Sequence, residues 1–119
     1  MSTSFPLKKI KVVLLENINQ KAVEIFEAAG FHVEHHPCAY NGQELIDVAG
    51  DAHIIGIRSK TKLTAEYFEN APRLWGVGCF CIGTNQVDLT SAAQAGVPVF
   101  NAPFQNTRSV AELVICEII

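Results

Sequence analysis

Residues 11–30 read Lys-Val-Val-Leu-Leu-Glu-Asn-Ile-Asn-Gln-Lys-Ala-Val-Glu-Ile-Phe-Glu-Ala-Ala-Gly. The first five residues form an apolar run that is typical of a buried strand. Residues 20–29 then place apolar side chains three and four positions apart, which is the spacing of an amphipathic helix, and Gly30 follows as a helix stop. The stretch therefore predicts a buried strand followed by a helix.

The same alternation continues along the rest of the chain. Apolar runs at residues 31–36, 52–57, 74–78 and 97–100 predict four more strands. Capping signals predict the intervening short helices, with starts marked by Asn41 plus Glu44, by Thr64 and by Asp88. Strands separated by helices pair in parallel through right-handed crossovers. The sequence therefore predicts an α/β fold, a flavodoxin-like, doubly wound parallel sheet of five strands in the order 2-1-3-4-5.

Composition narrows the class of protein. The chain has 119 residues, of which 49% are hydrophobic and 18% charged, as in a single globular domain. A net charge of -3 argues against a general nucleic-acid surface. The apolar runs are shorter than the roughly 20 residues that span a bilayer, and the amino end lacks the apolar core of a secretory signal. We therefore expect a cytoplasmic protein with neither nucleic acid nor membrane as a partner.

Candidate ligand-binding residues follow the predicted strands, because such sheets bind ligands at the carboxyl ends of their strands. Arg58 and Ser59 leave the third strand together, and Lys60 adds a second cation. A guanidinium beside a hydroxyl suits a carboxylate or a phosphate. The alternative is that Arg58 pairs with Glu16 or Asp88 at the same edge.

Two further polar segments are predicted at this edge. Residues 79–86 contain Gly83, which has two possible roles. It would either let backbone N–H groups face an anion or simply adopt the conformation of a tight turn. In residues 101–112, Ser109 and Glu112 have capping-box spacing, which leaves Asn106 without a capping role. The apolar helix after it reaches Ile119 without a glycine or asparagine cap. We therefore expect an incomplete linking helix that continues or docks outside this sequence, and a homo-oligomer is one expected outcome.

Other chemistries have weaker support in the sequence. The four cysteines lack zinc or thioredoxin spacing, and a nucleophilic Cys79 or Cys81 has no histidine nearby in sequence. His35 and His36 alternate to opposite faces of a strand, so we expect no shared metal site. No Gly-x-Gly-x-x-Gly follows any strand, so the sequence predicts no dinucleotide-binding residues here.

Three segments resemble the amino-terminal part of the D-2-hydroxyacid dehydrogenase family, and together with their surroundings they cover almost the whole chain. Residues 55–61 read Ile-Gly-Ile-Arg-Ser-Lys-Thr, residues 78–89 read Gly-Cys-Phe-Cys-Ile-Gly-Thr-Asn-Gln-Val-Asp-Leu, and residues 101–114 read Asn-Ala-Pro-Phe-Gln-Asn-Thr-Arg-Ser-Val-Ala-Glu-Leu-Val. The last segment is general to the family. The middle one resembles the branch that serves serine synthesis.

The resemblance implies an NAD-dependent oxidation of 3-phosphoglycerate, or of a related 2-hydroxy acid, to the corresponding keto acid, here 3-phosphohydroxypyruvate on the way to L-serine. It implies that residues 1–105 form the substrate-binding domain and that residues 106–119 begin the helix toward an NAD-binding domain. Arg58, Ser59 and Asn106 look like substrate contacts. Lys60 falls at a position that is often basic, and the Ile82-Gly83 pair looks like the loop that faces the reaction centre.

The resemblance also implies a division of labour within a longer chain. The family's catalytic and NAD-binding residues fall beyond Ile119, so we expect these residues to partner the remainder of a dehydrogenase and to be inactive alone. His36-Pro37-Cys38 stand where some bacterial relatives place a lysine near the substrate phosphate. Two interpretations stay open: a stand-alone flavodoxin-like binding or regulatory module, and a different D-2-hydroxyacid dehydrogenase.

Overall fold

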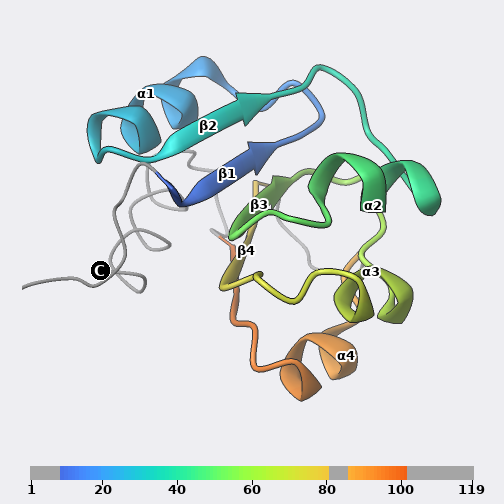
Figure 1. Cartoon of the computed structure of the whole chain (residues 1–119). Coiled ribbons are helices and arrows are strands. Elements are labelled where there is room, and N and C mark those ends of the chain that lie inside the picture. Colours follow the sequence, from blue (N-terminus) through green and yellow to red (C-terminus); the bar gives the residue numbers. More distant parts are fainter. Residues whose placement is uncertain (1–8, 81–85, 102–119) are drawn as a thin grey trace, which may run out of the picture.

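Five parallel strands form one sheet in the order β2-β1-β3-β4-β5, as the sequence predicts (Figure 1). The structure, a computed structural model, describes residues 9–80 and 86–101. The linking helix expected after residue 105 lies outside this part of the chain. The elements in chain order are β1 (Lys11–Leu14), α1 (Gln20–Ala28), β2 (His32–His35), α2 (Gln43–Ala49), β3 (Ile54–Ile57), α3 (Ala65–Glu69), β4 (Gly76–Cys79), α4 (Leu89–Gln94) and β5 (Val99–Asn101).

Alternation along the strands divides the apolar side chains between two faces of the sheet. Val13 belongs to the cluster that packs under α2, α3 and α4, whereas Val12 and Leu14 belong to the cluster under α1. Figure 1 shows α1 apart from the other three helices. Because both faces are covered, β3 and β4 are apolar throughout and β1 is apolar after Lys11, which is characteristic of parallel sheets.

Helix α1 has the start and the buried face that its sequence predicts. The Asn19 side chain accepts a hydrogen bond of 2.8 Å from the backbone N–H of Lys21. Ala22, Val23 and Phe26 are buried, so one apolar stripe of the helix lies on the sheet. The helix thereby forms the cover of this face.

The predicted capping box of α2 is wrong. The helix begins after Gly42, which has a φ of 62° that favours glycine, and no side chain caps it. Asn41 instead accepts a hydrogen bond of 2.8 Å from the backbone N–H of Lys62, in the loop after β3. The Asn41 side chain therefore joins two loops rather than starting a helix.

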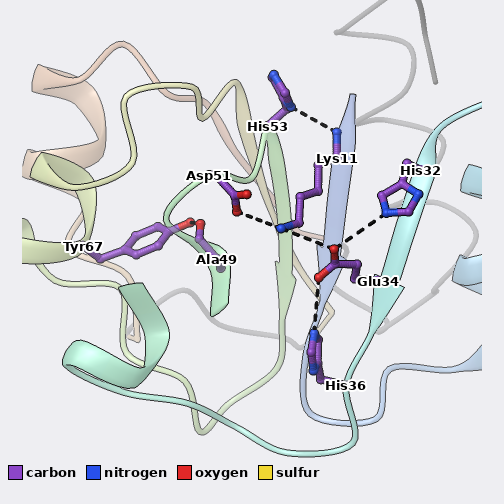
Figure 2. A network of polar contacts seen from close by, with 8 residues as sticks. All are labelled: Lys11, His32, Glu34, His36, Ala49, Asp51, His53 and Tyr67. Atoms are coloured by element: carbon purple, nitrogen blue, oxygen red, sulfur yellow. Dashed lines mark hydrogen bonds and ion pairs between the residues drawn. The ribbon is translucent and has the colours of Figure 1, made fainter. Parts of the chain in front are cut away.

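A polar network lies on β1 and β2 beside the end of α2 (Figure 2). The Lys11 ammonium contacts Asp51 at 2.8 Å and Glu34 at 3.3 Å, and His32 and His36 lie 3.7 Å from the Glu34 carboxylate. Burial lowers the pKa of Lys11, but the two acids outweigh it and the pKa is raised. Lys11 thus stays charged between two acids at the start of β1.

None of the helices in residues 9–80 and 86–101 is long and apolar enough to cross a membrane.

Candidate functional site

A hollow of about 340 Å³ lies at the carboxyl ends of β1, β2 and β3. The residues that line it are Glu16, Pro37, Cys38, Ala39, Arg58, Ser59 and Lys60. Three adjacent strands therefore deliver their following loops to one place, as the strand order requires. The predicted trio after β3 forms one wall, and the segment after β2 forms another.

Glu16 ties the loop after β3 in place. Its carboxylate accepts hydrogen bonds from the backbone N–H groups of Arg58 and Lys60, both at 2.8 Å, and of Thr61 at 3.0 Å. Glu16 itself is buried, with 9% of its surface exposed. Its charge is therefore satisfied by backbone amides, and the predicted alternative of an ion pair between Glu16 and the Arg58 side chain is not observed.

These bonds also set the charge state of Glu16. Burial raises the pKa of the carboxyl, but the N–H groups of Lys60, Thr61 and Arg58 together outweigh it, so the pKa lies below its ordinary value of 4.5. The carboxylate is ionised at neutral pH. Both of its oxygens are bonded to backbone N–H groups, and it forms no ion pair with the described side chains of Arg58 and Lys60.

Three more hydrogen bonds fix the surrounding loops. Glu16 and Asn17 have φ angles of 60° and 53°, and their N–H groups donate to the carbonyls of Cys38 and His36, each at 3.0 Å. From the start of the segment that precedes α4, Gln86 donates through its side-chain amide to the carbonyl of Arg58 at 2.7 Å. The left-handed turn after β1 is therefore bonded to β2, and the backbone of Arg58 is held at both its N–H and its carbonyl.

The cationic side chains remain open to solvent. Arg58, Ser59 and Lys60 are all exposed. Within residues 9–80 and 86–101, Arg58 and Lys60 form no ion pair, either with Asp88 or with another acid. A fixed backbone thus presents a guanidinium, a hydroxyl and an ammonium to one hollow. Such a set of donors suits a carboxylate or phosphate.

The sequence of this chain matches a known family over most of its length. The sequence model of one protein family, the catalytic domain of the D-isomer specific 2-hydroxyacid dehydrogenases, matches residues 12–115. The chain belongs to this family.

Individual 2-hydroxyacid dehydrogenases agree with that assignment. The chain is 54% identical over 118 residues to D-3-phosphoglycerate dehydrogenase of Dictyostelium discoideum, covering 99% of this chain and 29% of the relative. It is 55% identical over 117 residues to D-3-phosphoglycerate dehydrogenase of Haemophilus influenzae, covering 98% of this chain and 28% of that relative. The chain thus spans less than a third of the length of these relatives.

A solved structure gives the same result for the fold. The NAD+-bound 3-phosphoglycerate dehydrogenase of Entamoeba histolytica superposes with a TM-score of 0.70 and 26% identity, over 92% of this chain and 38% of that chain. The sheet described above is therefore the sheet of a 2-hydroxyacid dehydrogenase domain.

The structure brings together half of the residues that the sequence predicts for substrate. Arg58, Ser59 and Lys60 lie in the hollow. Ile82, Gly83 and Asn106 lie outside the described residues, so their predicted roles stay predictions.

Sequence reasoning did not assign Glu16 and Gln86 their roles as loop anchors. The available signal for Glu16 was its position. It is a single acid directly after a buried strand, at the edge where the Arg58 loop also emerges. Its partners are backbone groups more than 40 residues away, so no local pattern reports them. Gln86 was visible only as one of several amides in its loop.

The surroundings of the described cysteines and histidines differ from one residue to the next. Cys79 is buried, whereas Cys38 is exposed in the hollow, and neither forms a disulfide. The His35 ring lies 2.8 Å from the carbonyl of Ile18, while His36 faces Glu34. Residues 9–80 and 86–101 contain no group of three ligands able to hold a metal ion.

Proposed function

We propose that this chain is the substrate-binding portion of an NAD-dependent D-3-phosphoglycerate dehydrogenase, which oxidises 3-phosphoglycerate to 3-phosphohydroxypyruvate as the first step of L-serine synthesis. The observation that carries the proposal is the hollow in which Arg58, Ser59 and Lys60 are exposed on a fixed backbone. The relatives support it, because identity of 54% or more extends over nearly the whole chain.

The substrate matches this hollow in charge. 3-Phosphoglycerate carries a carboxylate and a phosphate, and Arg58 and Lys60 offer two cations in the loop after β3. The hydroxyl of Ser59 adds a donor for either group. Pro37 and Cys38 line the side of the hollow where some relatives have a lysine, so the cations of the loop after β3 carry more of the binding here.

The described residues do not fit NAD. A dinucleotide pyrophosphate needs a glycine-rich turn that lets the backbone approach it at a helix start. The turn after β1 is Glu16-Asn17, and the Glu16 carboxylate occupies the backbone donors of the neighbouring loop. We therefore propose that NAD binds to other residues of the full dehydrogenase, and that the 119 residues alone bind substrate without oxidising it.

A titration followed by amide chemical shifts tests the proposal. Adding 3-phosphoglycerate to the 119-residue chain is expected to shift the amides of Arg58, Ser59 and Lys60 in a saturable manner, whereas NAD leaves them unchanged. Arg58→Gln is expected to weaken binding about tenfold, the equivalent of one charge-assisted hydrogen bond. Lys62→Gln, an exposed lysine two positions beyond the trio, serves as the matched control.

The outcome also separates this function from its closest alternative. If D-glycerate and D-lactate bind as tightly as 3-phosphoglycerate, the parent enzyme is a different D-2-hydroxyacid dehydrogenase. If none of the three acids shifts these amides, the chain is not a substrate-binding domain, and the proposal fails.

A further inference from the structure

The loop after β3, which carries the cations, is bonded to the segment before α4 as well as to Glu16. The N–H of Leu63 donates to the carbonyl of Gln86, and the N–H of Asp88 donates to the carbonyl of Leu63, both at 2.9 Å. Leu63 and Val87 thereby form a parallel bridge, and both residues are buried. The two segments are therefore joined by backbone bonds that do not depend on the type of side chain.

The Gln86 side chain adds a bond to this bridge at the residue that carries the first cation. Its Nε2 donates to the carbonyl of Arg58 at 2.7 Å, and only 6% of Gln86 is exposed. A hydrogen bond shielded from water in this way is stronger than the same bond in solvent. Because 28 positions separate the two residues, the fold makes this bond and no local turn does.

The bond completes the support of the Arg58 backbone. Glu16 accepts from the N–H of Arg58 at 2.8 Å, which holds the peptide plane before its Cα, and Gln86 holds the plane after it. A residue has only two soft backbone dihedrals, so holding both planes sets the direction in which the Arg58 side chain leaves the chain. An exposed side chain on a backbone that is ordered in advance has less freedom to lose when it binds a ligand.

We propose that Gln86 is a positioning residue of the substrate site, which keeps the Arg58 guanidinium in place for the carboxylate or phosphate of the substrate. This inference rests on the proposed function, because it assigns Gln86 a part in the binding of 3-phosphoglycerate. The described residues that line the hollow do not include Gln86. Its effect on the substrate is therefore exerted through Arg58 and not by direct contact.

Gln86→Met tests the inference, because methionine has a similar length and no donor. In the 119-residue chain it is expected to weaken 3-phosphoglycerate binding about fivefold, measured from the amide shifts of Ser59 and Lys60. The Ser59 amide is also expected to shift before ligand is added, because its N–H and the Arg58 carbonyl belong to one peptide group. Gln94→Met, at an exposed position of α4, is the control and is expected to change neither readout.

A double-mutant cycle separates positioning from a purely structural role. Once Arg58→Gln has removed the guanidinium, Gln86→Met is expected to weaken binding less than about twofold. A change that only lowers stability alters the apparent affinity in proportion to the folded fraction, which urea denaturation measures. Gln86→Asn, which keeps the amide but is one methylene too short to reach the carbonyl, is expected to show the same loss of affinity as Gln86→Met.

The outcomes distinguish this inference from the proposed function. If the native chain binds 3-phosphoglycerate and Gln86→Met and Gln86→Asn bind it equally well, the inference is overturned and the proposed function stands. An equal loss in the native and Arg58→Gln backgrounds also overturns the inference alone. If the native chain does not bind 3-phosphoglycerate, both fail together.

Discussion

The single side chain of Glu16 positions a whole wall of the candidate site. Three backbone N–H groups of the loop after β3 converge on its carboxylate. Hydrogen bonds to an ionised group are stronger than neutral ones, and a buried amide that loses its acceptor is costly. The cations of the loop are therefore positioned by a residue of opposite charge that does not pair with them.

Replacing Glu16 by Gln is expected to lower the free energy of unfolding by about 2 kcal/mol, because the amide lacks the charge and offers one acceptor oxygen in place of two. Urea denaturation at pH 7 measures the change. Glu24→Gln, at an exposed position of α1, is the control and is expected to change little. Equal stability of the two variants would show that the three bonds do not hold the loop.

The same carboxylate predicts a dependence on pH. Its pKa in the folded state lies below 4.5, so its contribution is fully present above pH 4.5 and is lost as the pH falls through the folded pKa. The stability difference between the native chain and Glu16→Gln is therefore expected to shrink in acid. Urea midpoints at pH 7, 5, 4 and 3 test this, and a difference that grows toward pH 3 would contradict it.

At this scale the sequence predicted which residues line the hollow better than it predicted the residues that hold them in place. Arg58, Ser59 and Lys60 could be predicted because the carboxyl ends of parallel strands meet at one edge. Glu16 was considered only as an ion-pair partner, since an acid and a cation suggest each other. Its true partners are backbone N–H groups, which every residue type except proline has. The sequence therefore gives no sign of which residues will donate them.

At the scale of elements, helix starts differ in whether the capping residue forms a bond. Asn19 accepts from Lys21 and Asp88 accepts from Ser91 at 3.1 Å, whereas Thr64 holds the capping position of α3 without a side-chain cap bond. Residue type alone predicted the positions at Thr64 and Asp88, whereas the cap at Asn19 was not predicted. Residue type did not distinguish the caps that form the bond from the one that does not.

This difference predicts unequal costs of truncation. Asn19→Ala is expected to lower the free energy of unfolding by about 1 kcal/mol, because an N–H of α1 loses its acceptor. Thr64→Ala is expected to cost less than about 0.5 kcal/mol, since no cap bond is lost. Thermal or urea unfolding of the two variants compares them, and a larger loss for Thr64→Ala would show that the threonine contributes in another way.

Asn41 shows why an element boundary escapes a local pattern. Asn41 and Glu44 have capping-box spacing, but the positive φ of Gly42 starts the helix one residue later. The Asn41 side chain is then available to Lys62, 21 residues away. The conformation of one glycine therefore changed the role of its neighbour.

At the scale of the whole molecule, side chains from separate segments pack closely on Gly56 in the middle of the sheet. A methyl group on Gly56 would lie 2.6 Å from Leu14 Cδ2 and 2.9 Å from Phe80 Cε1. The strand order was predictable without this detail, because right-handed crossovers between alternating strands and helices allow few arrangements. The close approach was not, because it depends on side chains of three separate segments.

Gly56→Ala is expected to lower the free energy of unfolding by about 1–3 kcal/mol through overpacking under α1. A double-mutant cycle with Leu14→Ala tests the cause, since removing the Leu14 side chain makes room for the new methyl group. The cost of Gly56→Ala is expected to be smaller in the Leu14→Ala background. Strict additivity of the two changes would mean that the strain arises elsewhere.

The place of β1 between β2 and β3 also bears on how the chain is made. Lys11, the first residue of β1, bonds to His53, just before β3, across 42 positions. A ribosome that adds about 5–20 residues per second takes roughly 2–8 s to cover that distance. Until β3 has been made, β1 can pair with no strand of the sheet other than β2, and the edge that β3 will cover is open to neighbouring chains. A chaperone that binds this segment during the interval would therefore protect that edge from pairing with the wrong strand.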